Sequence, residues 1–352
     1  MNSARIKHRI ALVAFLTIAA ATAWAGEAQN AFDDGVKYQR AGKYKEAISA
    51  YNRAIKADPQ AAEPYVGRGS SFAKLGESER AIKDYNEAIK LNPKLADAYF
   101  NRGNLYDDLK QHGSAIKDYD AALKLNPKLH EAYNNRGLTY YQLGQTERAI
   151  KDYDEAIKLN PKFAAGYFNR GNAYFVQRQF ERAIKNYDEV IKQNPKAARG
   201  YFQRANANYG LNRFEKAIED FNRAQKLDPN NPEIYYGRGL SQRRLGNHER
   251  AVADYSESIK LDPEFTEAYN NRANAYSLIG NYGQALKDYD QAIKLDPKNA
   301  RVYANRGAVK LRQGKADEAR RDFKKAVELD PSLKEKLDSL TSDSKAAPAT
   351  KR

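Results

Sequence analysis

The sequence predicts an all-α solenoid built from nine tandem helix-turn-helix repeats. Three observations lead to this fold class. Prolines recur every 34 residues, apolar residues follow helical spacing within each interval, and small residues occupy the same places in every interval. A fixed period of roughly 20–50 residues is typical of repeat architectures. The periodic prolines are Pro59, Pro93, Pro127, Pro161, Pro195, Pro229, Pro263, Pro297 and Pro331.

Each repeat contains two apolar-periodic segments. We number repeat positions so that the proline is position 32; the repeats then begin at residues 28, 62, 96, 130, 164, 198, 232, 266 and 300. Positions 2–14 and 17–30 each carry apolar residues at spacings of three to four, which predicts two helices. In the fourth repeat, Gly144 suits the end of the first helix because glycine readily adopts positive φ. Pro161 ends the second helix, since proline disfavours helical geometry in the residue before it.

Small and aromatic residues predict how the two helices pack. Position 8 is glycine or alanine and position 20 is alanine in all nine repeats, so the helix axes can approach closely. Position 24 is tyrosine or phenylalanine throughout, and position 4 is tyrosine in the last eight repeats. Aromatic side chains bury much apolar area. We therefore expect both aromatic columns to fill the core rather than to form a ligand site.

This set of positions, with glycine at 8, tyrosine at 11, alanine at 20 and 27 and proline at 32, resembles the tetratricopeptide repeat family. The resemblance covers nearly all of the chain after residue 25. It implies a right-handed superhelix in which the first helix of each pair lines the concave face and the second helix forms the convex face.

The N-terminal 25 residues are typical of a secretory signal peptide. Basic residues precede an apolar run from Ile10 to Ala23, and Ala23-Trp24-Ala25 has the small-x-small form of a cleavage site. The alternative is a retained membrane anchor, but the run is short for a span of about 20 residues. We expect cleavage after Ala25 and export, to the periplasm in the first place and to the exterior as the alternative, with no transmembrane span in the mature chain.

Beyond the ninth repeat, Leu333, Leu337 and Leu340 recur at helical spacing and predict a short capping helix over 334–340. Residues 341–352 are small, polar and charged, which predicts a disordered tail. The expected organisation is a signal peptide (1–25), a nine-repeat solenoid (26–333), the capping helix and the tail.

The chain is strongly basic, with a formal net charge of +15, which becomes +12 without the three Lys and Arg residues of the signal. Lysines at positions 22 and 29 fall on one face of the second helix. This face is either a solvated surface or a site for anionic cell-envelope surfaces; the export signal argues against nucleic acid as a partner. The lysines are Lys83, Lys117, Lys151, Lys185 and Lys287, then Lys90, Lys124, Lys158, Lys192, Lys226, Lys260 and Lys294.

Position 7 is arginine in the last eight repeats, and position 23 of the same repeats is aspartate or asparagine. The first repeat lacks both, with Asp34 and Ala50 instead. This matched change predicts an ion pair between the two helices of a repeat; the alternative is an arginine ladder for anions. The arginines are Arg68, Arg102, Arg136, Arg170, Arg204, Arg238, Arg272 and Arg306.

Side-chain amides recur at position 6. Asparagine is a poor helix former, so its recurrence favours a binding role, and an amide offers the donors and acceptor that pair with an extended peptide backbone. The column resembles the asparagine ladder of the O-linked N-acetylglucosamine transferases, and it is interrupted at Gly67 and Gly237. The alternative is that Asn-Arg-Gly is simply common in such repeats. The residues are Asn101, Asn135, Asn169, Gln203, Asn271 and Asn305.

Positions 5, 9 and 12 complete a candidate peptide-binding groove. Amides occur at position 9, in Asn104, Asn172, Asn206 and Asn274. Aromatics occur at positions 5 and 12, in Phe100, Tyr141, Phe168, Phe175, Phe202, Tyr209 and Tyr236. If exposed, they would serve as interface anchors; the alternative is that neighbouring repeats bury them.

Catalytic chemistry is not expected. The histidines have no metal-ligand spacing, and the sequence contains no cysteine, phosphate-binding loop or nucleophile elbow. We therefore predict an exported, non-catalytic scaffold without cofactor or metal that binds polypeptide segments in its groove. The alternatives are a basic envelope-associated structural protein that acts through its lysine face, and a hidden enzyme or an accessory subunit of one.

Overall fold

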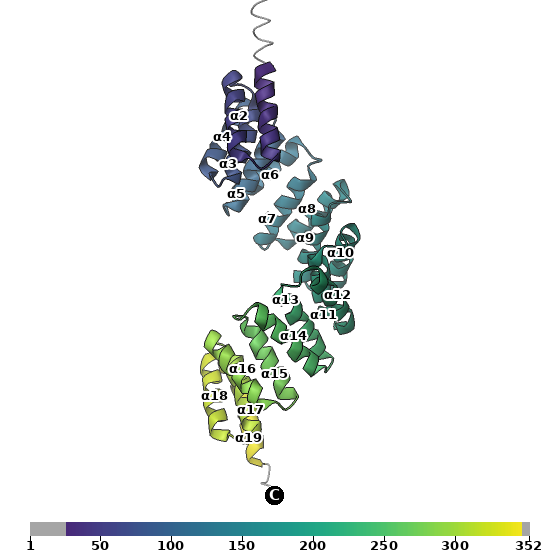
Figure 1. Ribbon diagram of the computed structural model, residues 1–352, viewed down its shortest axis with the longest axis vertical. Helices are drawn as coiled ribbons and strands as arrows, with labels where there is room; N and C mark the ends of the chain where they lie inside the picture. Colours follow the sequence, from purple (N-terminus) through teal and green to yellow (C-terminus); the bar gives the residue numbers. More distant parts are fainter. Residues whose placement is uncertain (1–25, 347–352) are drawn as a thin grey trace, which may run out of the picture. The chain divides into compact units, whose positions relative to one another are not determined.

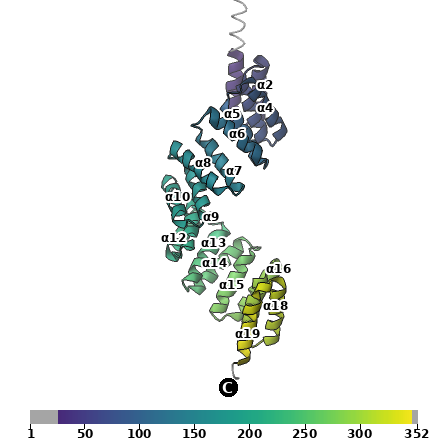
Figure 2. The same ribbon diagram turned by 180° about the vertical axis from the view of Figure 1, so that it is seen from behind.

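The computed structural model describes residues 26–346, which are all-α (Figure 1). The predicted signal peptide lies outside the described residues. The chain divides into two compact units, one up to Ala173 and one from Tyr174 on, and α9 contains the division. Within each unit, helices that are neighbours in the sequence lie side by side in both Figure 1 and Figure 2.

The first unit begins with a helix over residues 26–40. It continues with α2 (Tyr44–Ala57), α3 (Ala62–Lys74), α4 (Ser78–Leu91), α5 (Ala96–Asp108), α6 (His112–Leu125), α7 (His130–Gln142), α8 (Thr146–Leu159) and α9 (Ala164–Val176). The second unit contains α10 (Phe180–Gln193), α11 (Ala198–Gly210), α12 (Phe214–Leu227), α13 (Pro232–Arg244), α14 (His248–Leu261), α15 (Thr266–Leu278), α16 (Tyr282–Leu295), α17 (Ala300–Arg312), α18 (Ala316–Leu329), the short 3-10 helix η1 (Pro331–Leu333) and α19 (Lys334–Ala346). The two predicted helices of each repeat are confirmed, with the first helix at positions 1–13 from the second repeat on.

Two kinds of turn separate the helices. After the first helix, Gly144 has a φ of 74°, and the next residue, Gln145, donates its backbone N–H to the carbonyl of Tyr140 at 2.8 Å. After the second helix, Asn160 is extended, with φ −134° and ψ 91°, and its side-chain oxygen accepts the backbone N–H of Lys162 at 3.1 Å. Both turns satisfy backbone groups that a helix end leaves free.

Position 24 forms the core, as predicted. Its tyrosines and phenylalanines are at most 5 % exposed, and the alanines at position 20 are fully buried. The small residue at position 8 is required by contact: a Cβ on Gly137 would lie 2.8 Å from the ring of Tyr153. Close packing of this kind leaves no room for a larger side chain.

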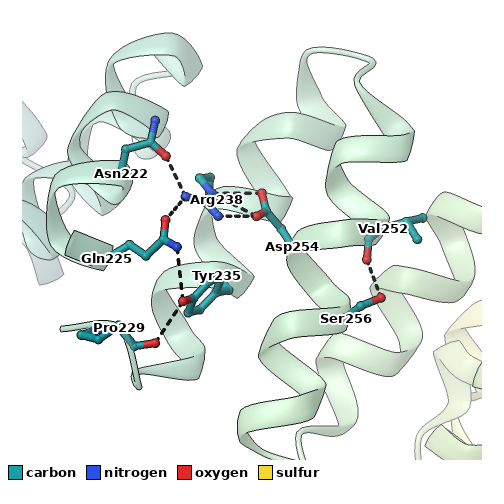
Figure 3. Close-up of polar contacts among 8 residues, drawn as sticks. All are labelled: Asn222, Gln225, Pro229, Tyr235, Arg238, Val252, Asp254 and Ser256. Carbon is teal, nitrogen blue, oxygen red and sulfur yellow. Dashed lines mark hydrogen bonds and ion pairs between the residues drawn. The ribbon is translucent and has the colours of Figure 1, made fainter. Parts of the chain in front are cut away.

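The prediction for position 4 is only partly right, because this column is half-buried apart from Tyr235. The hydroxyl of Tyr235 donates to the carbonyl of Pro229 at 3.0 Å (Figure 3). The guanidinium of Arg238 lies over the ring of Tyr235. In the last eight repeats, the distance from the position 7 guanidinium carbon to the centroid of the position 4 ring is 5.4–5.7 Å. A tyrosine with one apolar and one polar end suits such an edge position.

The predicted ion pairs between positions 7 and 23 are confirmed in seven repeats. Arg238 on α13 contacts both carboxylate oxygens of Asp254 on α14, with Nη2 2.6 Å from Oδ1 (Figure 3). The same two-pronged contact joins Arg68 to Asp84, Arg102 to Asp118, Arg136 to Asp152, Arg204 to Asp220, Arg272 to Asp288 and Arg306 to Asp322. Paired bonds of this geometry fix orientation as well as charge.

Each position 7 arginine also reaches the preceding repeat, a contact that the sequence analysis missed. Its Nη1 donates to the residue at position 25 of that repeat, for example from Arg238 to Asn222 at 2.7 Å (Figure 3). The other acceptors are Asn52, Asn86, Asp120, Asp154, Asp188, Ser256 and Asp290. We call an arginine with its position 23 and position 25 partners an arginine joint; it connects three helices.

The C-terminal helix is longer than predicted. Helix α19 extends to Ala346, so the first six residues of the expected disordered tail are helical, and 347–352 lie outside the described residues. Leu337 is 4 % exposed and packs with Phe323 of α18, in keeping with a capping role.

Candidate functional site

The predicted groove residues all lie on first helices, from α5 to α17. Every one of the seventeen is partly exposed, neither buried in the core nor free in solvent. The predicted groove residues are divided between the two units, so the contacts within each unit are described separately.

In the first unit, side-chain amides bond to one another from repeat to repeat. Asn135 on α7 donates from Nδ2 to Oδ1 of Asn104 on α5 at 2.9 Å, and Oδ1 of Asn135 accepts from Asn134 at 3.0 Å. Asn169 on α9 donates to Oδ1 of Asn134 at 2.9 Å. The core hydroxyl of Tyr119 also donates to Asn104, at 2.9 Å. These contacts form a continuous amide row across three first helices.

The second unit has the same kind of contacts in shorter stretches. Asn305 on α17 donates to Oδ1 of Asn270 on α15 at 3.2 Å. Asn271 donates to the hydroxyl of Tyr236 on α13 at 3.0 Å, and burial is the main reason that the pKa of this tyrosine is raised to about 12. The hydroxyl of Tyr289 donates to Asn274 at 2.7 Å, as the corresponding tyrosine does in the first unit.

The amide rows include two residues that sequence reasoning missed. Asn134 and Asn270 stand at position 5, which we had assigned to aromatics. The available signal was the doubled Asn-Asn at 134–135 and 270–271. A primary amide has two N–H donors and a carbonyl that can accept twice, so one contact to each neighbour leaves part of this capacity unused.

The interruptions of the amide column have a steric cause. A Cβ on Gly67 would lie 2.4 Å from the ring of Tyr51, and a Cβ on Gly237 would lie 2.4 Å from the ring of Phe221. In both places the core ring of the preceding repeat occupies the space that an amide side chain would need.

The groove aromatics divide into two groups. Those at position 5 lean on the core ring of their own repeat, with centroid distances of 6.2 Å for Phe100 and 6.0 Å for Phe202. Those at position 12 lie near the turns, where Phe175 contacts Phe180 at 5.4 Å. In the second unit, Phe175 and Tyr209 line a pocket of about 680 Å³ together with Asn206.

The arginines and lysines have more ordinary surroundings. Seven of the position 7 arginines are engaged in arginine joints, and the eighth, Arg170, pairs with Asp154 at 2.6 Å, which removes the basis for an anion ladder. The lysines at positions 22 and 29 are exposed, and several at position 29 pair with a glutamate three residues earlier, such as Lys90 with Glu87 at 3.0 Å and Lys158 with Glu155 at 3.1 Å. This face therefore carries charges of both signs.

Two further properties concern residues 26–346 only. No helix in this range is long and apolar enough to cross a membrane. No group of three or more His, Cys, Asp or Glu side chains is arranged to bind a metal within the same range.

Comparison with solved structures finds proteins of similar fold. Solved structures of similar fold include PilF of Pseudomonas aeruginosa (TM-score 0.54, 18% identity, 59% of this chain and 94% of that chain covered). A tetratricopeptide repeat protein from Parabacteroides merdae has a TM-score of 0.51 at 19% identity, covering 74% of this chain and 99% of that one. YrrB, described as a TPR protein with an unusual peptide-binding site, has a TM-score of 0.46 at 22% identity, covering 52% and 95%.

A search of curated proteins finds no match to this chain. Sequence models of one repeat family match almost the whole repeat region. Models described as tetratricopeptide repeat match 96–129, 118–151, 168–232, 266–299 and 300–333, and one described as TPR repeat matches 36–76, 69–110, 138–177 and 241–280. Members of this family are typically non-catalytic scaffolds for protein–protein interaction. With its 34-residue period, paired helices and these matches, the chain belongs to the tetratricopeptide repeat family.

Proposed function

We propose that this chain is an exported, non-catalytic scaffold that binds extended polypeptide segments along the groove formed by its first helices. The observation that carries the proposal is the amide row from Asn104 through Asn135 to Asn169. These three side chains are partly exposed, and hydrogen bonds to one another and to the buried Asn134 hold them in place.

The bonds within the amide row are the source of its affinity for a peptide backbone. Side chains that are already fixed lose less conformational entropy when they bind a partner. Each amide keeps unused donor or acceptor capacity, which matches the N–H and C=O of an extended chain. Because bonds to the backbone do not depend on the partner's side chains, the amide row supplies affinity for polypeptides of varied sequence. The groove aromatics supply contacts with particular side chains of the partner.

Export rests on the sequence of residues 1–25 alone. Protein purified from the cell envelope should begin at Gly26 when its N-terminus is sequenced. An intact Met1 on envelope-associated protein would instead indicate a retained anchor.

The groove is tested by a capture experiment with the tagged full chain as bait in envelope extract. The test variant carries Asn135→Ala, Asn169→Ala and Phe168→Ala. At about 1 kcal/mol for each lost contact, partner affinity should fall on the order of 100-fold. The matched control carries Lys151→Ala and Lys158→Ala on the neighbouring second helix, and circular dichroism verifies that both variants fold.

The two candidate modes of binding give different results. Groove binding requires that partners be lost from the groove variant, retained by the lysine variant and retained at moderate salt. If partners are still captured by the groove variant but are not captured by the lysine variant, or are released by salt, the lysine face binds anionic surfaces instead.

A further inference from the structure

The second unit contains a pocket at the turns between first and second helices. It has a volume of about 680 Å³. It is lined by the ends of α9, α11 and α13, by the first residue of α10, and by the turns that follow α9 and α11. We call it the turn pocket and define it by Phe175, Val176, Arg178, Phe180, Tyr209 and Arg244. All of these residues belong to the second unit.

Backbone conformation distinguishes the turns at this pocket. Position 15 adopts positive φ, and six repeats place glycine there. Arg178 and Asn212, both of which line the pocket, occupy this position with φ of 58° and 57°. The left-handed conformation is unfavourable for residues with a Cβ, and strain of this kind tends to gather at functional sites. Lys110, in the third repeat, is the other such residue in the described chain.

Other departures from the repeat pattern gather at the same place. Phenylalanine stands at position 17 in the fifth and sixth repeats only, as Phe180 and Phe214. Position 13 is glycine only at Gly210, where a Cβ would lie 2.8 Å from the ring of Phe180. The repeats share one fold, so substitutions that coincide at one pocket are explained by that pocket rather than by the fold.

The charge of the pocket is positive. The guanidinium of Arg178 lies 5.7 Å from the ring centroid of Phe180, and that of Arg244 lies 4.9 Å from the ring of Phe214. Arg244 also donates to Oδ1 of Asn212 at 3.2 Å. No carboxylate is among the lining residues in the described part of the chain. A guanidinium stacked on a ring keeps its N–H edge available for a carboxylate.

An apolar surface lies beside these charges. Val176 is 60 % exposed, the highest fraction among the exposed large hydrophobic residues of the described chain. Next to it, the rings of Phe175 and Tyr209 are partly exposed. An exposed apolar side chain among aromatic rings is typical of an interaction site.

We propose that the turn pocket binds an acidic segment of a polypeptide partner. Carboxylates of the segment pair with Arg178 and Arg244, and an adjoining apolar side chain packs on Val176 between the two rings. This inference rests on the proposed polypeptide-binding function and names the chemistry of the partner segment that the turn pocket would bind.

The pocket is tested by fluorescence anisotropy with the full chain. The probe is a labelled eight-residue peptide, blocked at both ends, with three glutamates around a Phe-Leu pair. Arg178→Gly removes a pocket cation and introduces the glycine that six repeats have at this position, so the variant should be at least as stable as the parent and bind the probe about tenfold or more weakly. Lys110→Gly makes the same backbone change away from the pocket and should leave affinity unchanged.

Two altered probes separate the contributions. Glutamine in place of the glutamates, or serine in place of Phe-Leu, should each weaken binding about tenfold. Equal affinity for the glutamine probe, unchanged affinity in Arg178→Gly, no binding to the parent chain, or full competition by inorganic phosphate at equal concentration would each overturn the proposal. If the groove variant (Asn135→Ala, Asn169→Ala and Phe168→Ala) no longer binds the probe while Arg178→Gly still does, the groove is supported and the pocket is rejected. If Arg178→Gly no longer binds the probe while the groove variant still does, the pocket is supported and the groove is rejected.

Discussion

At some positions of this chain the residue must be glycine, because an aromatic ring occupies the space that a Cβ would need. Tyr51 is fully buried between two of them: a Cβ on Gly35 would lie 2.5 Å from its ring, and a Cβ on Gly67 would lie 2.4 Å from it. Its hydroxyl donates to Gln39 at 3.0 Å, which holds the ring in place. The ring therefore has little freedom to move away from an added methyl group.

Gly67→Ala should consequently lower the free energy of unfolding by about 2 kcal/mol, the usual cost of overpacking a core. Gly113→Ala is the matched control, because a Cβ there meets nothing within 4 Å and alanine is favoured over glycine in a helix. Urea denaturation gives both values. A Gly67→Ala variant as stable as the parent would mean that the core at this contact relaxes freely.

The sequence revealed the gaps in the amide column but not their cause. At Gly67 and Gly237 the cause is a ring from the preceding repeat, and contacts between repeats cannot be derived from the composition of one column. The amide row had a similar limit: position 6 could be predicted, whereas the contributions of Asn134 and Asn270 depend on how successive first helices face each other.

Between elements, the arginine joint connects more than the two helices that the sequence indicated. Covariation of positions 7 and 23 within the chain predicted the pair inside a repeat. The contact with position 25 was not visible, because that column alternates among asparagine, aspartate and serine, which share only an acceptor oxygen.

Removing one such arginine should be costly. Asp152 is 6 % exposed, and in Arg136→Ala its carboxylate would be left buried without its partner, at a cost of about 3 kcal/mol. The comparison is Arg53→Ala, whose pair with Asp34 is solvent-exposed and should contribute under about 1 kcal/mol. Thermal and urea unfolding measure both. Equal effects of the two substitutions would show that the joint adds nothing beyond a surface pair.

Across the whole molecule, the buried tyrosine column makes stability sensitive to alkaline pH. Burial raises the pKa of Tyr85 from 10.0 to about 12, and it is likewise the main cause of the raised pKa of Tyr119, Tyr153, Tyr255 and Tyr289. A raised pKa means that the unfolded chain loses the phenolic proton first. The stabilising contribution is therefore complete below pH 10 and is lost as the pH rises through the folded-state value.

Between about pH 10 and 12, each such tyrosine should remove about 1.4 kcal/mol of stability per pH unit. Urea unfolding at several pH values, with phenolate absorbance as a second signal, measures this slope. Tyr85→Phe should make the slope shallower by one tyrosine's share, and the native Phe221 shows that the fold accepts phenylalanine at this position. A flat profile to pH 12 would contradict the role of burial.

For the whole molecule, the sequence predicted the fold class, the repeat frame and both helices of each repeat, because the same residue pattern occurs nine times at a fixed period. It predicted less where nothing repeats. Helix α19 continues past Leu340, where the sequence has no apolar periodicity from which a helix could be predicted. The turn pocket depends on residues that differ between repeats, so the average pattern conceals it.

The arginine joint also bears on how such a chain can change in length. An interior repeat carries an arginine for the repeat before it and an acceptor for the repeat after it, whereas the first repeat has Asp34 at position 7 and the ninth has Lys324 at position 25. Duplication of any interior 34-residue segment would thus place a compatible donor and acceptor at both new boundaries. Gain or loss of an interior repeat would lengthen or shorten the molecule without any compensating substitution.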